Sequence, residues 1–211
     1  EEKILRKDME IRLLYSQINP HFLYNTLGMI INEAEKEGAE NTTELIELLS
    51  GMFRYNLQKE QYLVPLKKEI EYIQSYLLLL KKRYGEGFTA IFELDHTLDE
   101  YPVPHIFLQP LIENCIVHGS CAGQEKLDII IRTLQTETEK LIIIKNTGNI
   151  LSREQVKELN DMVQREFEVG KQERVKTLQN INFRLKTACS GQCGLNFEFD
   201  ENYVVLKIRI G

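Results

Sequence analysis

Apolar residues recur at helical spacing through the first part of the chain. Ile4, Ile11 and Ile18 are seven residues apart, and Leu14 follows Ile11 by three, which is the spacing of a coiled-coil seam. The pattern predicts a long helix over residues 1–37. Such a helix cannot bury its seam alone. We therefore expect it to form a hairpin with the next helix and two copies of the hairpin to pair as a homodimeric four-helix bundle.

The remaining chain is predicted to mix helices with strands, because its apolar period changes after residue 85. Helical spacing predicts helices over 43–57, 66–84, 104–119, 152–165 and 174–188. Alternating or β-branched runs predict strands over 88–94, 127–134, 140–145, 195–199 and 203–210. The expected fold is α+β, with helical residues 1–84 as one domain and an α/β sandwich over residues 85–211 as the second.

Composition narrows the class of protein. The chain has 211 residues and a net charge of −6, which argues against nucleic acid as the main partner. No apolar stretch approaches the roughly 20 residues that a membrane span needs, and no signal peptide is seen. The first residue is Glu1, so we expect a fragment of a longer protein.

The four cysteines, Cys115, Cys121, Cys189 and Cys193, are expected to be ordinary thiols, with zinc binding a weaker alternative.

Residues 17–26 hold a proline and a histidine side by side within the predicted long helix. Pro20 in a helix interior costs roughly 3 kcal/mol, which suggests that the geometry around His21 is needed. Asn25 lies one turn after His21 on the same helical face. Imidazole accepts and donates groups near neutral pH, and the amide can orient a water or a phosphoryl group. The alternative is a packed histidine at a helix kink.

A second motif carries polar side chains on an otherwise apolar helix. Glu113, Asn114 and His118 lie within about a turn and a half of one another. A carboxylate, an amide and an imidazole in this setting suit a pocket for a metal-bound phosphate, because Mg²⁺ prefers oxygen ligands. The alternative is a helix with a polar edge facing water.

Together the two motifs resemble the kinase core of sensor histidine kinases of the LytS/YesM type. The run N-P-H-F-L-Y-N-T is similar to that family's phosphoacceptor box, and E-N-x-x-x-H-G resembles the asparagine box of the GHKL ATP-binding fold. Residues 66–77 and 83–85 resemble the family's second signature helix. The resemblance covers almost the whole chain.

The resemblance implies an ATP- and Mg²⁺-dependent protein histidine kinase. His21 would be phosphorylated, Asn25 would position the phosphoryl group or a hydrolytic water, and Glu113 would act beside the metal-bound phosphate. Asn114 would hold Mg²⁺. The expected nucleotide-binding residues are Asn114, His118, Gly119, Asn146, Gly148 and Asn180. The implied partners are a second copy and a response regulator that receives the phosphoryl group on an aspartate. A sensor region upstream would anchor this cytoplasmic part of a bacterial protein to the membrane.

Four positions depart from the family pattern. Asn146 stands where an aspartate normally accepts a hydrogen bond from the adenine amino group. Val175 and Thr177 stand where two glycines normally let the backbone wrap the phosphates, and Val117 replaces a common basic residue. Loss of the charge would weaken adenine binding by roughly 1 to 2 kcal/mol. The alternative function is therefore a dimeric signalling or scaffold module without catalysis.

Overall fold

The computed structural model describes residues 20–57, 62–85, 87–119, 126–165, 173–189 and 191–211. Contacts divide the chain into two compact units, residues 1–58 and 59–211. The predicted seam from Ile4 to Ile18 lies outside the described residues. Among the described residues, no helix is both long and apolar enough to span a lipid bilayer.

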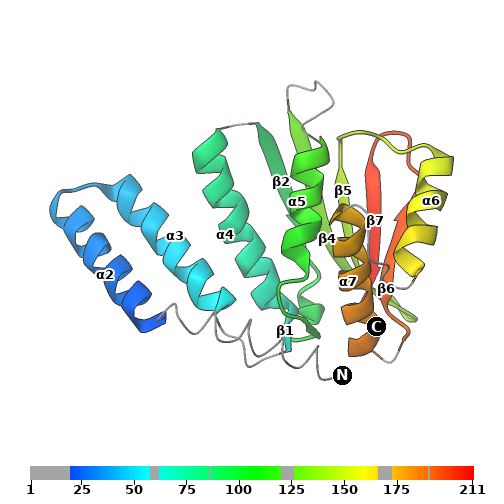
Figure 1. The fold of residues 1–211 in the computed structure, drawn as a ribbon, viewed down its shortest axis with the longest axis horizontal. Coiled ribbons are helices and arrows are strands. Elements are labelled where there is room, and N and C mark those ends of the chain that lie inside the picture. The colour runs from blue at the N-terminus through cyan, green and yellow to red at the C-terminus, as the bar shows by residue number, and fades with distance from the viewer. Residues whose placement is uncertain (1–19, 58–61, 86, 120–125, 166–172, 190) are drawn as a thin grey trace. The chain divides into compact units, whose positions relative to one another are not determined.

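The first unit is a helical hairpin in its described part (Figure 1). Helix α2 (Pro20–Lys36) and helix α3 (Glu40–Asn56) are joined by a short turn in which Gly38 has a φ of 68°, a conformation that glycine adopts without strain. Buried side chains between the helices include Leu27, Ala34 and Met52. The two predicted helices are thus confirmed where they are described, whereas the four-helix bundle and the dimer stay predictions.

The second unit is built on a five-stranded sheet with helices packed on one face (Figure 1). The strand order is β2-β4-β5-β7-β6, and β2 runs parallel to β4 while the other neighbours are antiparallel. The strands are β2 (Phe88–Glu93), β4 (Leu127–Gln135), β5 (Lys140–Asn146), β6 (Gly194–Glu198) and β7 (Val204–Arg209). The helices are α4 (Leu66–Tyr84), η1 (His96–Leu98), α5 (Leu108–Gly119), α6 (Arg153–Gln164) and α7 (Glu173–Ala188). The predicted mixture of helices and strands is confirmed.

The core lies between the sheet and its helices. Ile129 and Ile131 alternate inward along β4, and Ile142 and Ile144 do so along β5, as a sheet with one covered face requires. Facing them, the buried residues of α5 and α7 include Leu111, Ile112, Leu178, Ile181 and Leu185. This apolar layer holds the C-terminal half of α5 against the end of β5.

Helix α4 belongs to the second compact unit, which begins at Lys59. The predicted boundary after residue 84 therefore does not coincide with the division by contacts. The physical reason is that Leu66 and Ile73 of α4 are almost fully buried, in a helix that contacts α5 and the small antiparallel sheet of β1 (Leu63–Pro65) and β3 (Pro102–Pro104). The expected division of labour between residues 1–84 and 85–211 stays a prediction.

Candidate nucleotide-binding site

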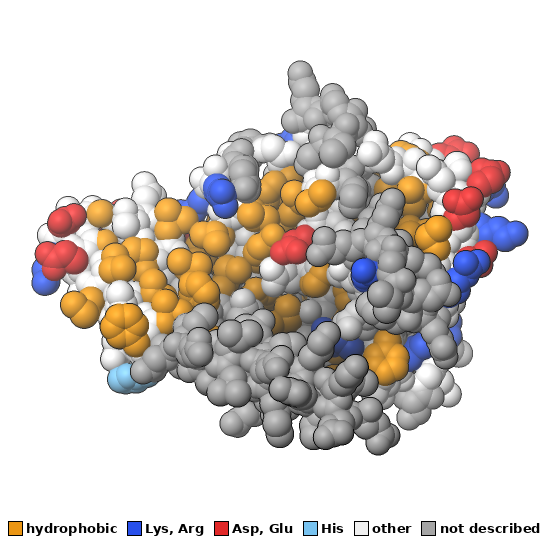
Figure 2. Space-filling model, in the orientation of Figure 1, with side chains coloured by type: hydrophobic (Ala, Val, Ile, Leu, Met, Phe, Trp, Pro, Cys, Tyr) orange, Lys and Arg blue, Asp and Glu red, His pale blue; other side chains and the backbone are white. Residues whose placement is uncertain are grey.

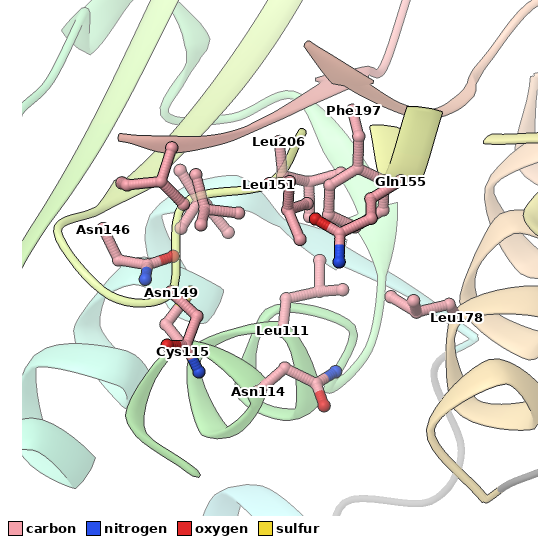
Figure 3. A pocket seen from close by; sticks show the side chains of 13 residues that line it. Leu111, Asn114, Cys115, Asn146, Asn149, Leu151, Gln155, Leu178, Phe197 and Leu206 are labelled. Atoms are coloured by element: carbon pink, nitrogen blue, oxygen red, sulfur yellow. The ribbon is translucent and has the colours of Figure 1, made fainter. Parts of the chain in front are cut away.

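A cavity of about 400 Å³ opens where α5, the end of β5 and the start of α6 meet (Figure 3). Its walls are mainly apolar, and the apolar lining residues include Leu111, Ile144, Leu178, Phe197 and Leu206. The few polar side chains among the lining residues are amides. Both the volume and this composition match the pockets that bind small molecules and cofactors.

Asn114 and Asn146, from different elements, both line this cavity, as Figure 3 shows. Asn146 is the last residue of β5 and is only 4% exposed. Asn114 comes from the middle of α5, and its Nδ2 atom is buried without a hydrogen-bond partner among the described residues. A buried polar atom without a partner costs about 1–3 kcal/mol, so a ligand that meets Asn114 would remove this cost.

The segment after β5 is fixed at both ends. Thr147 donates its backbone N–H to Asp128 O at 3.1 Å, and its hydroxyl accepts the Asp128 N–H at 2.9 Å. Ser152 caps α6 in a capping box: its hydroxyl accepts from Gln155 N at 3.3 Å, and Gln155 Oε1 accepts from Ser152 N at 2.8 Å. Gln155 also lines the cavity, so the capping box at the start of α6 also fixes one wall of the site.

Gly119 and Gly148 lie where close packing leaves no room for a side chain. Neither residue lines the cavity. A Cβ atom on Gly148 would lie 2.7 Å from Asn146 Nδ2, and one on Gly119 would lie 2.5 Å from Leu127 Cδ1. Both distances are shorter than side-chain atoms allow. The two glycines therefore let the end of α5 approach the turn after β5.

The residues present fit a magnesium–nucleotide complex. Asn114 offers an amide oxygen once its N and O atoms are exchanged, which is a matter of assignment rather than of shape. The described residues contain no cluster of three or more His, Cys, Asp or Glu side chains that could enclose a metal. Mg²⁺ commonly binds through one or two protein oxygens together with substrate phosphates, and an amide oxygen of Asn114 at the cavity agrees with that mode.

Glu113 is directed to α4 rather than to the cavity. Its Oε1 accepts the Tyr76 hydroxyl at 3.2 Å and Gln109 Nε2 at 2.7 Å, and it is not among the lining residues. Glu113 and Asn114 are about 100° apart around the helix, so the two side chains face different neighbours. The expected role of Glu113 beside a metal-bound phosphate stays a prediction, and this arrangement does not support it.

Two other predicted nucleotide-binding residues are not placed at the cavity by the described side chains. Asn180 is exposed on another face of α7, in a hollow shared with Gln164, Phe183 and Lys186. Leu178, two residues earlier, is the α7 residue that lines the cavity. The side chain of His118 lies outside the described part.

In the first unit, His21 and Asn25 are both exposed on α2. Asn25 Nδ2 lies 3.3 Å from Nδ1 and 3.5 Å from Nε2 of His21. The predicted one-turn relationship is therefore present, and the amide lies beside the nitrogen atoms at which phosphorylation would occur.

Sequence reasoning missed Glu69 of α4. Its carboxylate is fully buried and accepts the backbone N–H groups of Ile106, Phe107 and Leu108 at 2.6, 3.0 and 3.3 Å. The available signal was an acidic residue between the apolar positions Leu66 and Ile70 of one helix, where a charge is rare unless it has partners.

The prediction that Cys189 and Cys193 are ordinary thiols was wrong. The structure joins these two residues in a disulfide, with their Cα atoms 5.9 Å apart. The sequence separation is only four residues. The bond closes the short segment between α7 and β6. Cys115 is a free cysteine and lines the cavity, whereas Cys121 lies outside the described residues.

Comparisons with known proteins agree with the motifs. Residues 9–88 match the histidine kinase family. The chain is 31% identical over 197 residues to the sensor histidine kinase/phosphatase LytS of Staphylococcus aureus strains Mu50 and NCTC 8325, a match that covers 92% of this chain. The chain spans 33% of the length of these curated relatives.

Among solved structures, the histidine kinase domain of the blue-light activated histidine kinase from Erythrobacter litoralis EL346 aligns with 100% of this chain and 94% of its own. The TM-score is 0.51 and the sequence identity 10%, so this likeness concerns the fold alone. The matches place the chain in the histidine kinase family. Within that family it resembles the kinase core of the LytS type, as the two motifs predicted.

Proposed function

We propose that this chain is the ATP-dependent kinase core of a two-component sensor histidine kinase. The observation that carries the proposal is that Asn114 and Asn146 both line one mainly apolar cavity of ligand size. Asn146 would accept a hydrogen bond from the adenine amino group through its carbonyl oxygen. Asn114 would hold Mg²⁺, which when bound neutralises phosphate charge in phosphoryl transfer.

His21 is proposed as the acceptor. A lone pair on one ring nitrogen attacks the γ-phosphorus of ATP; a P–N bond forms, the bond to the β,γ-bridging oxygen breaks, and ADP leaves with that electron pair. The exposure of His21 supports this role because an acceptor must be reachable. Asn25, whose amide lies 3.3 Å from Nδ1, would position the phosphoryl group or a hydrolytic water. The phosphoryl group would then pass to an aspartate of a response regulator.

A second copy of the chain is the proposed partner of the α2–α3 hairpin. Phe22 and Met29 are seven residues apart on α2 and are 69% and 72% exposed, and Ile30 is 45% exposed. Figure 2 shows hydrophobic side chains gathered on this hairpin. Apolar surface of this kind favours association, and a homodimer would cover it. The chain would be the cytoplasmic part of a membrane-anchored bacterial protein.

Titration calorimetry with Mg-ATP tests the proposal directly. We expect binding, and after incubation with γ-labelled ATP an acid-labile mark on His21. His96→Ala and His105→Ala serve as controls, because both are histidines outside the two motifs. Absence of ATP binding at millimolar concentration would overturn the kinase proposal.

A non-catalytic signalling module is the second candidate, and one observation favours it. Val175 and Thr177 fall within α7, which begins at Glu173, whereas the family's glycines would let the backbone wrap the phosphates. A helical backbone with β-branched residues does not adopt such a loop readily. A chain that dimerises and binds a response regulator but not Mg-ATP would support this second function.

A further inference from the structure

Three polar side chains on one face of α4 are hydrogen-bonded to α5 and to the segment that enters it. They are Glu69, Tyr72 and Tyr76, spaced by three and four residues, so they form one row along the helix. All of these hydrogen bonds lie within the second compact unit. None of these residues lines the cavity, yet their partners are on the helix that carries Asn114.

Glu69 sets the start of α5. The first N–H groups of a helix have no partner within the helix, and negative charge is favourable at this end. The Glu69 carboxylate accepts three successive N–H groups at the entry to α5, from Ile106, Phe107 and Leu108, of which Leu108 is the first residue of the helix. Ile106 has a φ of 53°, which is unfavourable for a β-branched residue. Since this strained backbone donates to Glu69 at 2.6 Å, the carboxylate holds the turn from which α5 begins.

The two tyrosines continue the row along α5. Tyr72 donates its hydroxyl to Gln109 Oε1 at 2.7 Å, and Tyr76 donates to Glu113 Oε1 at 3.2 Å. Gln109 Nε2 donates to the same Glu113 oxygen at 2.7 Å. The chain neighbour of Glu113 is Asn114. Successive turns of α5 are thus tied to α4 up to the residue before the buried amide.

We propose that Glu69 is a positioning residue for Asn114: by fixing the start and rotation of α5, it holds the Asn114 amide where a magnesium-bound phosphate would meet it. This inference rests on the proposed function. The row runs along α4, which contains the family's second signature helix, so positioning α5 would be a physical role of that helix. In the proposed function, adenine is bound by Asn146 of β5, whereas the magnesium-bound phosphate is bound by Asn114 of α5. Adenine binding and phosphate binding can therefore be measured separately.

The test compares Glu69→Gln with Glu71→Gln, which makes the same change on an exposed residue of α4 that pairs with Lys68. Affinities for adenosine and for ATP are measured with and without Mg²⁺. We expect Glu69→Gln to reduce the Mg²⁺-dependent gain in ATP affinity by about 10- to 100-fold, as for other residues that orient a metal ligand. Adenosine affinity should stay unchanged, and Glu71→Gln should match the wild type in both.

A second readout needs no nucleotide. Amide hydrogen exchange within residues 106–108 should accelerate in Glu69→Gln, because one of the two accepting carboxylate oxygens becomes an amide group that cannot accept. Should Glu69→Gln fail to fold, the double variant Tyr72→Phe and Tyr76→Phe removes only two hydroxyl groups, and we expect the Mg²⁺-dependent gain to fall by about threefold.

The outcomes are distinguishable. A folded Glu69→Gln protein with a wild-type Mg²⁺-dependent gain overturns the inference and leaves the proposed function standing, as does an unchanged gain in the double tyrosine variant. Equal losses for adenosine and Mg-ATP would also overturn it, since they indicate general damage to the fold. Wild-type protein that binds neither ligand overturns the proposed function and the inference together.

Discussion

A Cβ atom on Gly148 would lie 2.3 Å from the Cα atom of Gly119. The C-terminus of α5 and the turn after β5 therefore touch through bare backbone. Asn114 and Asn146 lie on these two elements, so the glycine contact sets how closely the two amides approach across the cavity. Packing alone therefore explains why glycine stands at positions 119 and 148, and neither glycine needs to contact a nucleotide.

Gly148→Ala should lower the free energy of unfolding by about 1–3 kcal/mol, because backbone atoms cannot yield to the added methyl group as a flexible side chain would. Chemical denaturation measures the loss. Gly87→Ala is the control, since a Cβ there meets nothing within 4 Å. An unchanged unfolding midpoint in Gly148→Ala would contradict the close packing.

Asn146→Asp should have opposite effects on stability and on binding. Asn146 is 4% exposed, and a buried carboxylate without a partner costs stability, so the free protein should unfold at a lower denaturant concentration. Adenosine should bind about five- to thirtyfold more tightly, because the acceptor for its amino group becomes charged. Calorimetry with adenosine checks the second effect, and weaker binding would exclude an adenine contact at Asn146.

The sequence predicted the long periodic elements well. The strand expected over 140–145 is β5, and the helix expected over 152–165 is α6, because apolar periodicity is a local property. It did not predict β1 and β3, which are three residues each and contain prolines. The helix expected from residue 104 begins at Leu108, since Pro104 is in β3 and Ile106 has a positive φ.

The site was predicted only in part for a different physical reason. Resemblance to a family identified Asn114 and Asn146, and the fold brings both to one cavity. The directions of Glu113 and Asn180 depend on how α5 and α7 are rotated against their neighbours, which no local pattern specifies. Glu69 was missed because its partners are 37 to 39 residues further along the chain.

His21→Ala should abolish acid-labile phosphorylation, whereas Asn25→Ala should retain it at a rate lower by about 10- to 100-fold, as expected for a group that orients the reacting partners. The 3.3 Å separation of Asn25 Nδ2 from His21 Nδ1 motivates the second variant. Labelled ATP and acid lability measure both rates. A mark that persists in His21→Ala would show that another residue is the acceptor.

Asp95 should add acid sensitivity to the second unit. Its pKa is lowered below the usual 3.8, first by the hydroxyl of Thr97 and then by the Thr97 backbone N–H. A lowered pKa means that the ionised form stabilises the fold above about pH 4 and that this stabilisation is lost as pH falls through the folded pKa. The difference in urea midpoint between wild type and Asp95→Asn should therefore shrink from pH 6 to pH 3, and a constant difference would contradict this.

The first turns of α7 hold the two positions where the family has glycine, Val175 and Thr177. Restoring glycine at Val175 and Thr177 should tighten Mg-ATP binding if the phosphate-binding backbone is the weak part of the site. Both positions are helical, and glycine is about 1 kcal/mol less favourable than alanine in a helix interior, so the change also releases the first turn of α7 to form a loop. Adenosine lacks phosphates, and its affinity should stay constant. Circular dichroism should report a small loss of helix, and phosphorylation of His21 should rise with ATP affinity. A double variant that loses helix without gaining ATP affinity, together with an Asn146→Asp variant that gains none, would leave the non-catalytic module as the better account of this chain.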